Sequence, residues 1–343
     1  MKKYRLELNY VRVILCVMIV VTHVLTEYTN AHSNNAAQLE TLYWIRMLLI
    51  FGTPGFLMLT QLIFTLNLQG LPDNYLKRRL QYVFIPYIVM GAFYSYSEAI
   101  YLRKPFITQF VENVLKGQWY GYFILIILKF FILNVVIMKL WPKLLSSRTA
   151  VVIAILINIV YLYVYHHNTV VSGWIDNTYF FEANTVLLGW IGYYFVGSYL
   201  GRNYERLKAY FEDYGLFFIG ITLLAFILFV ITGDHDFADV TSNNEYIMLY
   251  CISAFFCIIH FSIKVQGMLL EAVTLISTYS FFIYLFHPII LQYVYAYTER
   301  FEGSTLLFML FSVLLTFGVC IGVGSLLRTF NIFKYVMGTQ PYR

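Results

Sequence analysis

Ten apolar segments recur along the chain and constrain its fold more than any other feature. Each has 16 to 23 residues, and a helix of about 20 apolar residues crosses the hydrocarbon core of a bilayer. The segments comprise residues 8–26, 44–66, 80–101, 119–140, 150–165, 185–200, 215–231, 246–263, 275–297 and 305–327. We therefore predict an all-α, polytopic integral membrane helix bundle of about ten transmembrane helices, with residues 1–343 forming a single domain.

Composition excludes several other classes of protein. Only 12% of the residues are charged, against about 25% in a soluble domain. The net charge of +5 comes from short basic clusters between apolar segments, so we expect no nucleic-acid partner. The four cysteines lie inside apolar runs and form no CxxC pair, so no metal site is expected. Walker A, GxSxG and HExxH motifs are absent, which argues against an ATP-driven pump and the common soluble hydrolases.

The distribution of basic residues predicts the topology. The N-terminus, the C-terminus and alternate loops hold about 16 Lys and Arg residues, whereas the other loops hold four: Arg103, Lys104, Lys116 and Arg300. Basic residues are enriched in cytoplasmic loops of membrane proteins. We therefore expect both termini in the cytoplasm, which agrees with an even number of helices.

The first apolar segment contains three ionisable residues in "RVILCVMIVVTHVLTE", namely Arg12, His23 and Glu27. At about 100° per residue, Arg12 and His23 share one helix face and lie about 16 Å apart along the axis. Glu27 follows His23 by one helical turn, where side chains meet. We predict that Glu27 orients the imidazole of His23, as an acid partner does in a catalytic dyad, and that Arg12 lies nearer the cytoplasm. The alternative is that all three side chains extend to the headgroups.

Other ionisable residues lie at membrane depth in the predicted helices, and each is a further candidate for the site. Arg46 and Glu98 both fall toward the outer side, where they can form a pair. Lys129 has no partner that the sequence identifies. His287 precedes Pro288 in "YLFHPII", where it has either a chemical role or a structural role at a proline kink.

A basic cluster begins the third segment. Lys77, Arg78 and Arg79 are adjacent at its cytoplasmic start, where cations suit phosphate groups. Topology determination and the binding of anionic lipids are the alternatives.

Aromatic residues open the fourth segment. Trp119 and Tyr120 are candidates for stacking against sugar rings, or they belong to the interfacial aromatic belt. The outer loops hold most of the acidic residues, including Asp176 and Glu182, and the sequence leaves open whether these take part in the chemistry.

Four stretches in this order, "RVILCVMIVVTH", "KRRLQYVFIPY", "GQWYGYFILIIL" and "STYSFFIYLFHPII", resemble acyltransferase family 3, the integral membrane O-acyltransferases of carbohydrates. The resemblance covers nearly the whole chain. It implies that the family's Arg and His correspond to Arg12 and His23, and that its basic cluster corresponds to Lys77, Arg78 and Arg79. With this correspondence we expect His23, oriented by Glu27, to be the catalytic base, and Arg12 and the basic cluster to bind the donor substrate.

The resemblance is strongest to members that belong to the locus for the biofilm polysaccharide poly-β-1,6-N-acetylglucosamine. It implies an O-acyltransferase, with succinyl the favoured acyl group, that modifies this exopolysaccharide. It also implies acyl-CoA (succinyl-CoA or acetyl-CoA) as donor substrate, no bound cofactor, and a place in the cell membrane. Two alternatives remain: an exporter of the polymer, and a scaffold for the membrane glycosyltransferase that makes it.

Overall fold

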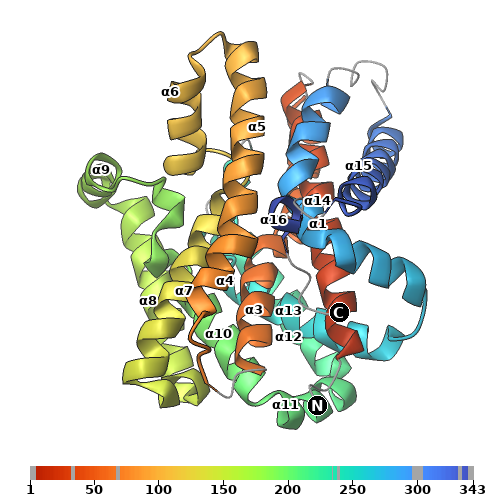
Figure 1. Cartoon of the computed structure of the whole chain (residues 1–343). Coiled ribbons are helices and arrows are strands. Elements are labelled where there is room, and N and C mark those ends of the chain that lie inside the picture. Colours follow the sequence, from red (N-terminus) through yellow and green to blue (C-terminus); the bar gives the residue numbers. More distant parts are fainter. Residues whose placement is uncertain are drawn as a thin grey trace.

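The computed structural model describes residues 5–31, 35–66, 70–233, 235–237, 240–295, 304–330 and 334–338, and these ranges contain helices and no β-strand (Figure 1). The long helices are α1 (Leu6–Ala31), α5 (Ile85–Leu102), α7 (Tyr122–Leu140), α8 (Arg148–His167), α12 (Gly215–Thr232), α13 (Met248–Val265), α14 (Leu270–Tyr295) and α15 (Thr305–Leu327). The shorter ones are α2 (Ala36–Leu49), α3 (Gly52–Leu66), α4 (Tyr75–Arg79), α6 (Phe106–Phe110), α9 (Thr169–Thr178), α10 (Ile191–Arg202), α11 (Tyr204–Asp213) and α16 (Lys334–Met337). Single turns of π-helix, η1 (Leu80–Phe84) and η2 (Val111–Leu115), and of 3-10 helix, η3 (Pro142–Ser146), η4 (Ala183–Thr185) and η5 (Leu187–Gly189), complete the described elements.

Within the described residues, nine helical stretches are long and apolar enough to cross a bilayer. Two of them join neighbouring elements: α2 with α3, and α4 and η1 with α5. These nine correspond to nine of the ten predicted segments, so the prediction of an all-α polytopic membrane protein is confirmed. The end of the 275–297 segment, at 296–297, lies outside the described residues. The cytoplasmic position of both termini and the single domain stay predictions.

The predicted segment 185–200 does not form a membrane-length helix. Its first part consists of the turns η4 and η5, and only the 12 residues of α10 follow as α-helix. A helix of this length is about 18 Å long, short of the roughly 30 Å hydrocarbon core. Gly197 and Gly201 of α10 face α3 so closely that a Cβ at either position would collide with its backbone. The glycines at this GxxxG spacing explain why the short helix is buried between α3 and α8.

Burial separates the central helices from the outer ones. In α1, 72% of the most apolar stretch is buried, compared with 17% in α8 and in α12. α1 packs against α2, α3, α13, α14 and α15. In Figure 1, α1 and α14 lie next to each other on one side of the bundle and α8 lies on the other. Polar side chains on α1 are therefore placed inside the bundle.

Candidate active site

Two histidines meet where α1 packs against α14. His23 Nδ1 and His287 Nε2 are 2.8 Å apart, and the ring centroids are 5.0 Å apart. His287 is fully buried, while His23 is partly exposed. Among the described residues, His23 Nε2 has no hydrogen-bond partner. The structure thus brings together two residues that are separated by 264 positions in the chain.

The backbone of α14 defines which nitrogen of each ring is protonated. His287 Nδ1 lies 3.0 Å from the carbonyl oxygen of Ile283, and because a carbonyl only accepts, this Nδ1 donates. In neutral His287, Nε2 is then an acceptor, so His23 Nδ1 donates to it. In neutral His23, Nε2 consequently retains its lone pair, which is the state that a general base requires.

Pro288 does not end α14, which continues from Leu270 to Tyr295. Proline lacks the N–H that the carbonyl four residues earlier, that of Tyr284, would accept. His287 supplies a side-chain donor to this part of the backbone through its bond to Ile283. The same ring therefore bonds to the backbone of its own helix and to His23, and a chemical role for His287 stays a prediction.

The expected contact between Glu27 and His23 is wrong. The Glu27 carboxylate accepts a hydrogen bond from the hydroxyl of Tyr120 at 2.6 Å, and His23 turns to His287 instead. The ring of Tyr120 lies over that of His23, with centroids 4.5 Å apart. Tyr120 therefore connects the two side chains, with its ring on the imidazole and its hydroxyl on the carboxylate. The catalytic roles of His23 and Glu27 stay predictions.

Tyr120 is held as a hydrogen-bond donor. The Glu27 carboxylate only accepts, so the hydroxyl of Tyr120 supplies the hydrogen of their bond. Tyr284 fixes the segment by donating its hydroxyl to the Tyr120 carbonyl at 2.7 Å.

Trp119 is 7% exposed and donates to the hydroxyl of Tyr87 at 3.3 Å. This burial places Trp119 inside the bundle. Its ring is therefore neither part of the interfacial aromatic belt nor an open surface on which a sugar could stack.

Arg12 lies on the same side of α1 as His23, as the 100° spacing predicted. Its guanidinium donates to the Ser277 hydroxyl of α14 at 3.4 Å, and Ser277 in turn lies 3.3 Å from the amide oxygen of Asn9. Arg12 is only 8% exposed. The side chains of Arg12 and His23 therefore both face α14. The alternative in which Arg12 extends to the headgroups is wrong. The donor-binding role of Arg12 stays a prediction.

The basic cluster forms α4, at the end of the bundle where α5 begins. Lys77 and Arg78 are exposed, and within the described residues neither forms an ion pair. Arg79 is oriented by the rings of Tyr75 and Phe131, with its guanidinium carbon 5.2 and 5.0 Å from their centroids. The π-helical turn η1 follows directly, and such turns are frequent at functional sites. The cluster does not contact His23, and its donor-binding role stays a prediction.

The predicted pairing of Arg46 with Glu98 is wrong. Arg46 is 1% exposed and its Nε donates to the Leu42 carbonyl at 3.2 Å. Glu98 accepts instead from the side-chain amides of Gln109 at 2.8 Å and Asn113 at 2.6 Å. Neither residue contacts the histidine pair directly.

Lys129 has the partner that the sequence did not identify. Its ammonium donates to the Thr185 hydroxyl at 2.9 Å and to Tyr179, and it lies 5.0 Å from the ring centroid of Phe181. These contacts attach the segment before η4 to α7. Lys129 is therefore satisfied by neutral groups, and it lies apart from His23.

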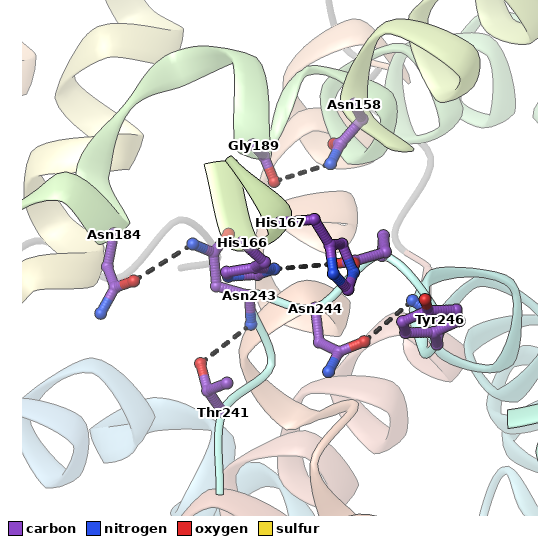
Figure 2. A network of polar contacts seen from close by, with 10 residues as sticks. Asn158, His166, His167, Asn184, Gly189, Thr241, Asn243, Asn244 and Tyr246 are labelled. Carbon is purple, nitrogen blue, oxygen red and sulfur yellow. Dashed lines mark hydrogen bonds and ion pairs between the residues drawn. The ribbon is translucent and has the colours of Figure 1, made fainter. Parts of the chain in front are cut away.

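The sequence did not single out a second histidine cluster, at the end of α8. His166 Nδ1 and His167 Nε2 lie 2.7 and 3.2 Å from the two oxygens of Glu245. Figure 2 shows these histidines among asparagines that link α8, the segment before α10 and the segment before α13. The adjacent pair "HH" was the available signal.

Asp176, a residue of α9, accepts from the Tyr165 hydroxyl at 2.9 Å, whereas Glu182 accepts from Thr185 only through its backbone carbonyl. Within the described residues, no group of His, Cys, Asp and Glu is arranged to hold a metal ion.

Comparison with known proteins gives the family. The acyltransferase domain family matches residues 5–325. A protein of Staphylococcus aureus (strain MSSA476) and one of Staphylococcus epidermidis, both named probable poly-beta-1,6-N-acetyl-D-glucosamine export protein, are 42% and 43% identical to the chain. The alignments cover 100% of this chain and 98% and 97% of theirs. No solved structure matches. The match over almost the entire chain shows that this multi-pass membrane protein belongs to the acyltransferase domain family, acyltransferase family 3.

Proposed function

We propose that the protein is a membrane O-acyltransferase that transfers an acyl group, succinyl by preference, to hydroxyls of poly-β-1,6-N-acetylglucosamine. The main support is the His23–His287 pair, because its hydrogen bonds leave His23 Nε2 as an unprotonated acceptor. Family membership supports acyl transfer, and the names of the staphylococcal relatives support the polysaccharide.

His23 acts as general base in this proposal. Its Nε2 removes the proton from a sugar hydroxyl as that oxygen attacks the thioester carbonyl, and the carbon–sulfur bond then breaks. The imidazolium returns the proton to the departing thiolate, so that ester and free thiol are the products. The Glu27 carboxylate, held in place by its hydrogen bond from Tyr120, stabilises the imidazolium electrostatically. His287 keeps the ring of His23 in place throughout.

The proposed donor is a cytoplasmic acyl-CoA, either succinyl-CoA or acetyl-CoA. Lys77, Arg78 and Arg79 are cations without acidic partners in the described structure, and they suit its phosphate groups. Arg12 lies between this end of the bundle and His23, about 16 Å along α1 from the imidazole. The flexible arm of the donor would follow the contact between α1 and α14 to reach the base.

A second candidate function is export of the polymer without chemistry, as the names of the relatives state. A role as partner of the membrane glycosyltransferase fits the same names. The paired histidines inside the bundle favour the enzyme, because export alone requires no free imidazole nitrogen.

The test is His23→Ala, with His167→Ala as a control from the exposed end of α8. In cells, the amount of secreted polymer and its ester-linked acyl content are measured. In isolated membranes, the rate of transfer to the polymer is measured with succinyl-CoA or acetyl-CoA labelled in the acyl group. We expect normal secretion and a loss of about 10²–10⁴-fold in transfer rate for His23→Ala alone. Lost secretion with normal acylation of the remaining polymer would show the exporter to be the correct function.

A further inference from the structure

A polar cluster around Glu98, separate from both histidine clusters, lies in the hairpin of α5 and α6 at the top of Figure 1. One oxygen of Glu98 accepts from the amides of both Gln109 and Asn113. Asn113 also donates to the Ser95 hydroxyl at 3.3 Å and accepts from Gln109 at 3.2 Å. Asn113 lies in the π-helical turn η2. Such turns are rare in proteins as a whole, and many of those that occur lie at functional sites.

The hydrogen bonds of this cluster leave acceptors and no free donors. A carboxylate only accepts, so the amide nitrogens of Gln109 and Asn113 must face Glu98. The oxygen Oε1 of Gln109 is consequently turned away. It is buried and has no partner among the described residues, although Gln109 itself is 4% exposed. The second oxygen of Glu98 also has no partner there, so a ligand for the cluster must provide O–H or N–H donors.

The cluster adjoins α14, the helix that carries His287. Ser97, next to Glu98, donates to the side-chain oxygen of Gln292 at 3.1 Å, and Gln292 follows His287 by five residues on α14. Tyr120, which contacts both His23 and Glu27, lies in the segment between this hairpin and α7. The cluster and the histidine pair therefore adjoin the same part of α14.

We propose that Glu98, with Gln109 and Asn113, forms a subsite for the acceptor, where it binds hydroxyl and amide N–H groups of a sugar unit next to the one that reacts. This proposal rests on the proposed function and adds the place where the polymer is held. Donor groups on carbohydrates match acceptors fixed by a hydrogen-bond network, whereas an acyl-CoA phosphate would be repelled by Glu98. In this proposal the acceptor polymer therefore binds at the end of the bundle that carries the α5–α6 hairpin, and the acyl-CoA donor binds near α4.

The test compares Glu98→Gln with Glu112→Gln, a change in a neighbouring carboxylate that forms an exposed ion pair with Lys104. Transfer kinetics are measured with N-acetylglucosamine and with its β-1,6-linked pentasaccharide. For Glu98→Gln we expect KM for the pentasaccharide to rise about tenfold or more. The kcat, the KM for acyl-CoA and the kinetics of the monosaccharide stay unchanged. Glu112→Gln should match the wild type in every measurement.

Direct binding of the pentasaccharide, measured by calorimetry, separates the subsite from the chemistry. If the wild type transfers no acyl group but binds the pentasaccharide, and Glu98→Gln weakens that binding, the subsite stands and the proposed function fails. If His23→Ala abolishes transfer while Glu98→Gln leaves KM and binding unchanged, the subsite is wrong and the proposed function stands. Should Glu98→Gln lower the melting temperature, Glu98→Asp retains the charge and shortens the reach; an unchanged KM there also overturns the subsite.

Discussion

The two histidine clusters use the same side chain in opposite ways. At the contact of α1 and α14, His23 and His287 bond to each other and to a backbone carbonyl. At the end of α8, His166 and His167 both bond to the carboxylate of Glu245. The first pair is partly or fully buried, and it leaves one ring nitrogen of His23 unpartnered in the described structure. The second lies at the exposed end of a helix, where Glu245 occupies one nitrogen of each ring.

This difference indicates that the hydrogen-bond partner of a histidine, more than its burial, determines whether its role is chemical or structural. A carboxylate shared by two imidazoles joins α8 to the segment before α13, and the asparagines around it in Figure 2 add the segment before α10. A carbonyl that fixes the tautomer of one ring makes that ring an acceptor for the next. We therefore expect chemistry at the first cluster and stability from the second.

After His23→Ala itself, the largest expected effect comes from breaking the first pair at His287. His287→Leu removes the acceptor for His23 Nδ1, so His23 loses both its orientation and its preferred tautomer. Transfer should fall about 10–100-fold, the range found when groups that orient metal-bound histidines are removed. His287→Gln keeps an acceptor at similar reach and should restore most of the rate. Both variants are tested by the rate at which membranes that contain them transfer the labelled acyl group from acyl-CoA to the polymer.

The matched change in the second cluster is His166→Ala with His167→Ala. We expect the rate of transfer to stay at the wild-type level, since these residues lie on the other side of the bundle from α14 (Figure 1). If the two pairs affected transfer equally, the division into a chemical and a structural cluster would be incorrect. If His287→Gln were as inactive as His287→Leu, hydrogen bonding to His23 would not be the task of His287.

The periodicity of α1 predicted part of this site, because helical geometry is local. Arg12 and His23 were placed on one face by their spacing, and both contact α14. His287 was a candidate from its place before Pro288, but its contact with His23 depends on how distant helices pack. The same limit explains the incorrect partner for Glu27. A spacing of four residues permits a contact with His23, whereas Tyr120, from a segment 93 positions away, provides the hydrogen bond that forms.

Hydropathy predicted the membrane-length helices for a similar reason, since lipid requires apolar length irrespective of tertiary packing. It failed for 185–200, where glycines that allow close packing and the turns η4 and η5 replace a regular span. The partners of Arg46, Glu98 and Lys129 are amides, hydroxyls and carbonyls. Such groups occur throughout the chain, so the sequence could not single out the correct ones.

An intermediate effect is expected from Tyr120, which connects the first cluster to a carboxylate. Tyr120→Phe keeps the ring over His23 and removes the hydrogen bond to Glu27, so transfer should fall about 3–10-fold, the size of a net hydrogen-bond contribution of roughly 0.5–1.5 kcal/mol. Glu27→Gln should have a similar effect. The double variant should be no slower than either single one, because both changes remove the same contact, with a coupling energy of about 0.5–3 kcal/mol. Strictly additive losses would show that Glu27 acts on His23 without Tyr120.

The smallest effect is expected from Glu245→Gln, and it concerns stability and its pH dependence. Burial acts to raise the pKa of this carboxyl, but hydrogen bonds from His166, from its own backbone amide and from His167 outweigh it and hold the pKa below its usual value. Its contribution to the free energy of unfolding is therefore complete above the usual pKa, near 4.5, and is lost as the pH falls through the lower pKa of the folded protein. At neutral pH, Glu245→Gln should lower the melting temperature in detergent by about 2–4 °C per kcal/mol lost, and the difference should shrink as the pH falls below the usual pKa of the carboxyl. Transfer at neutral pH should remain at the wild-type rate; a rate that fell with Glu245→Gln as it does with His287→Leu would place chemistry at the second cluster as well.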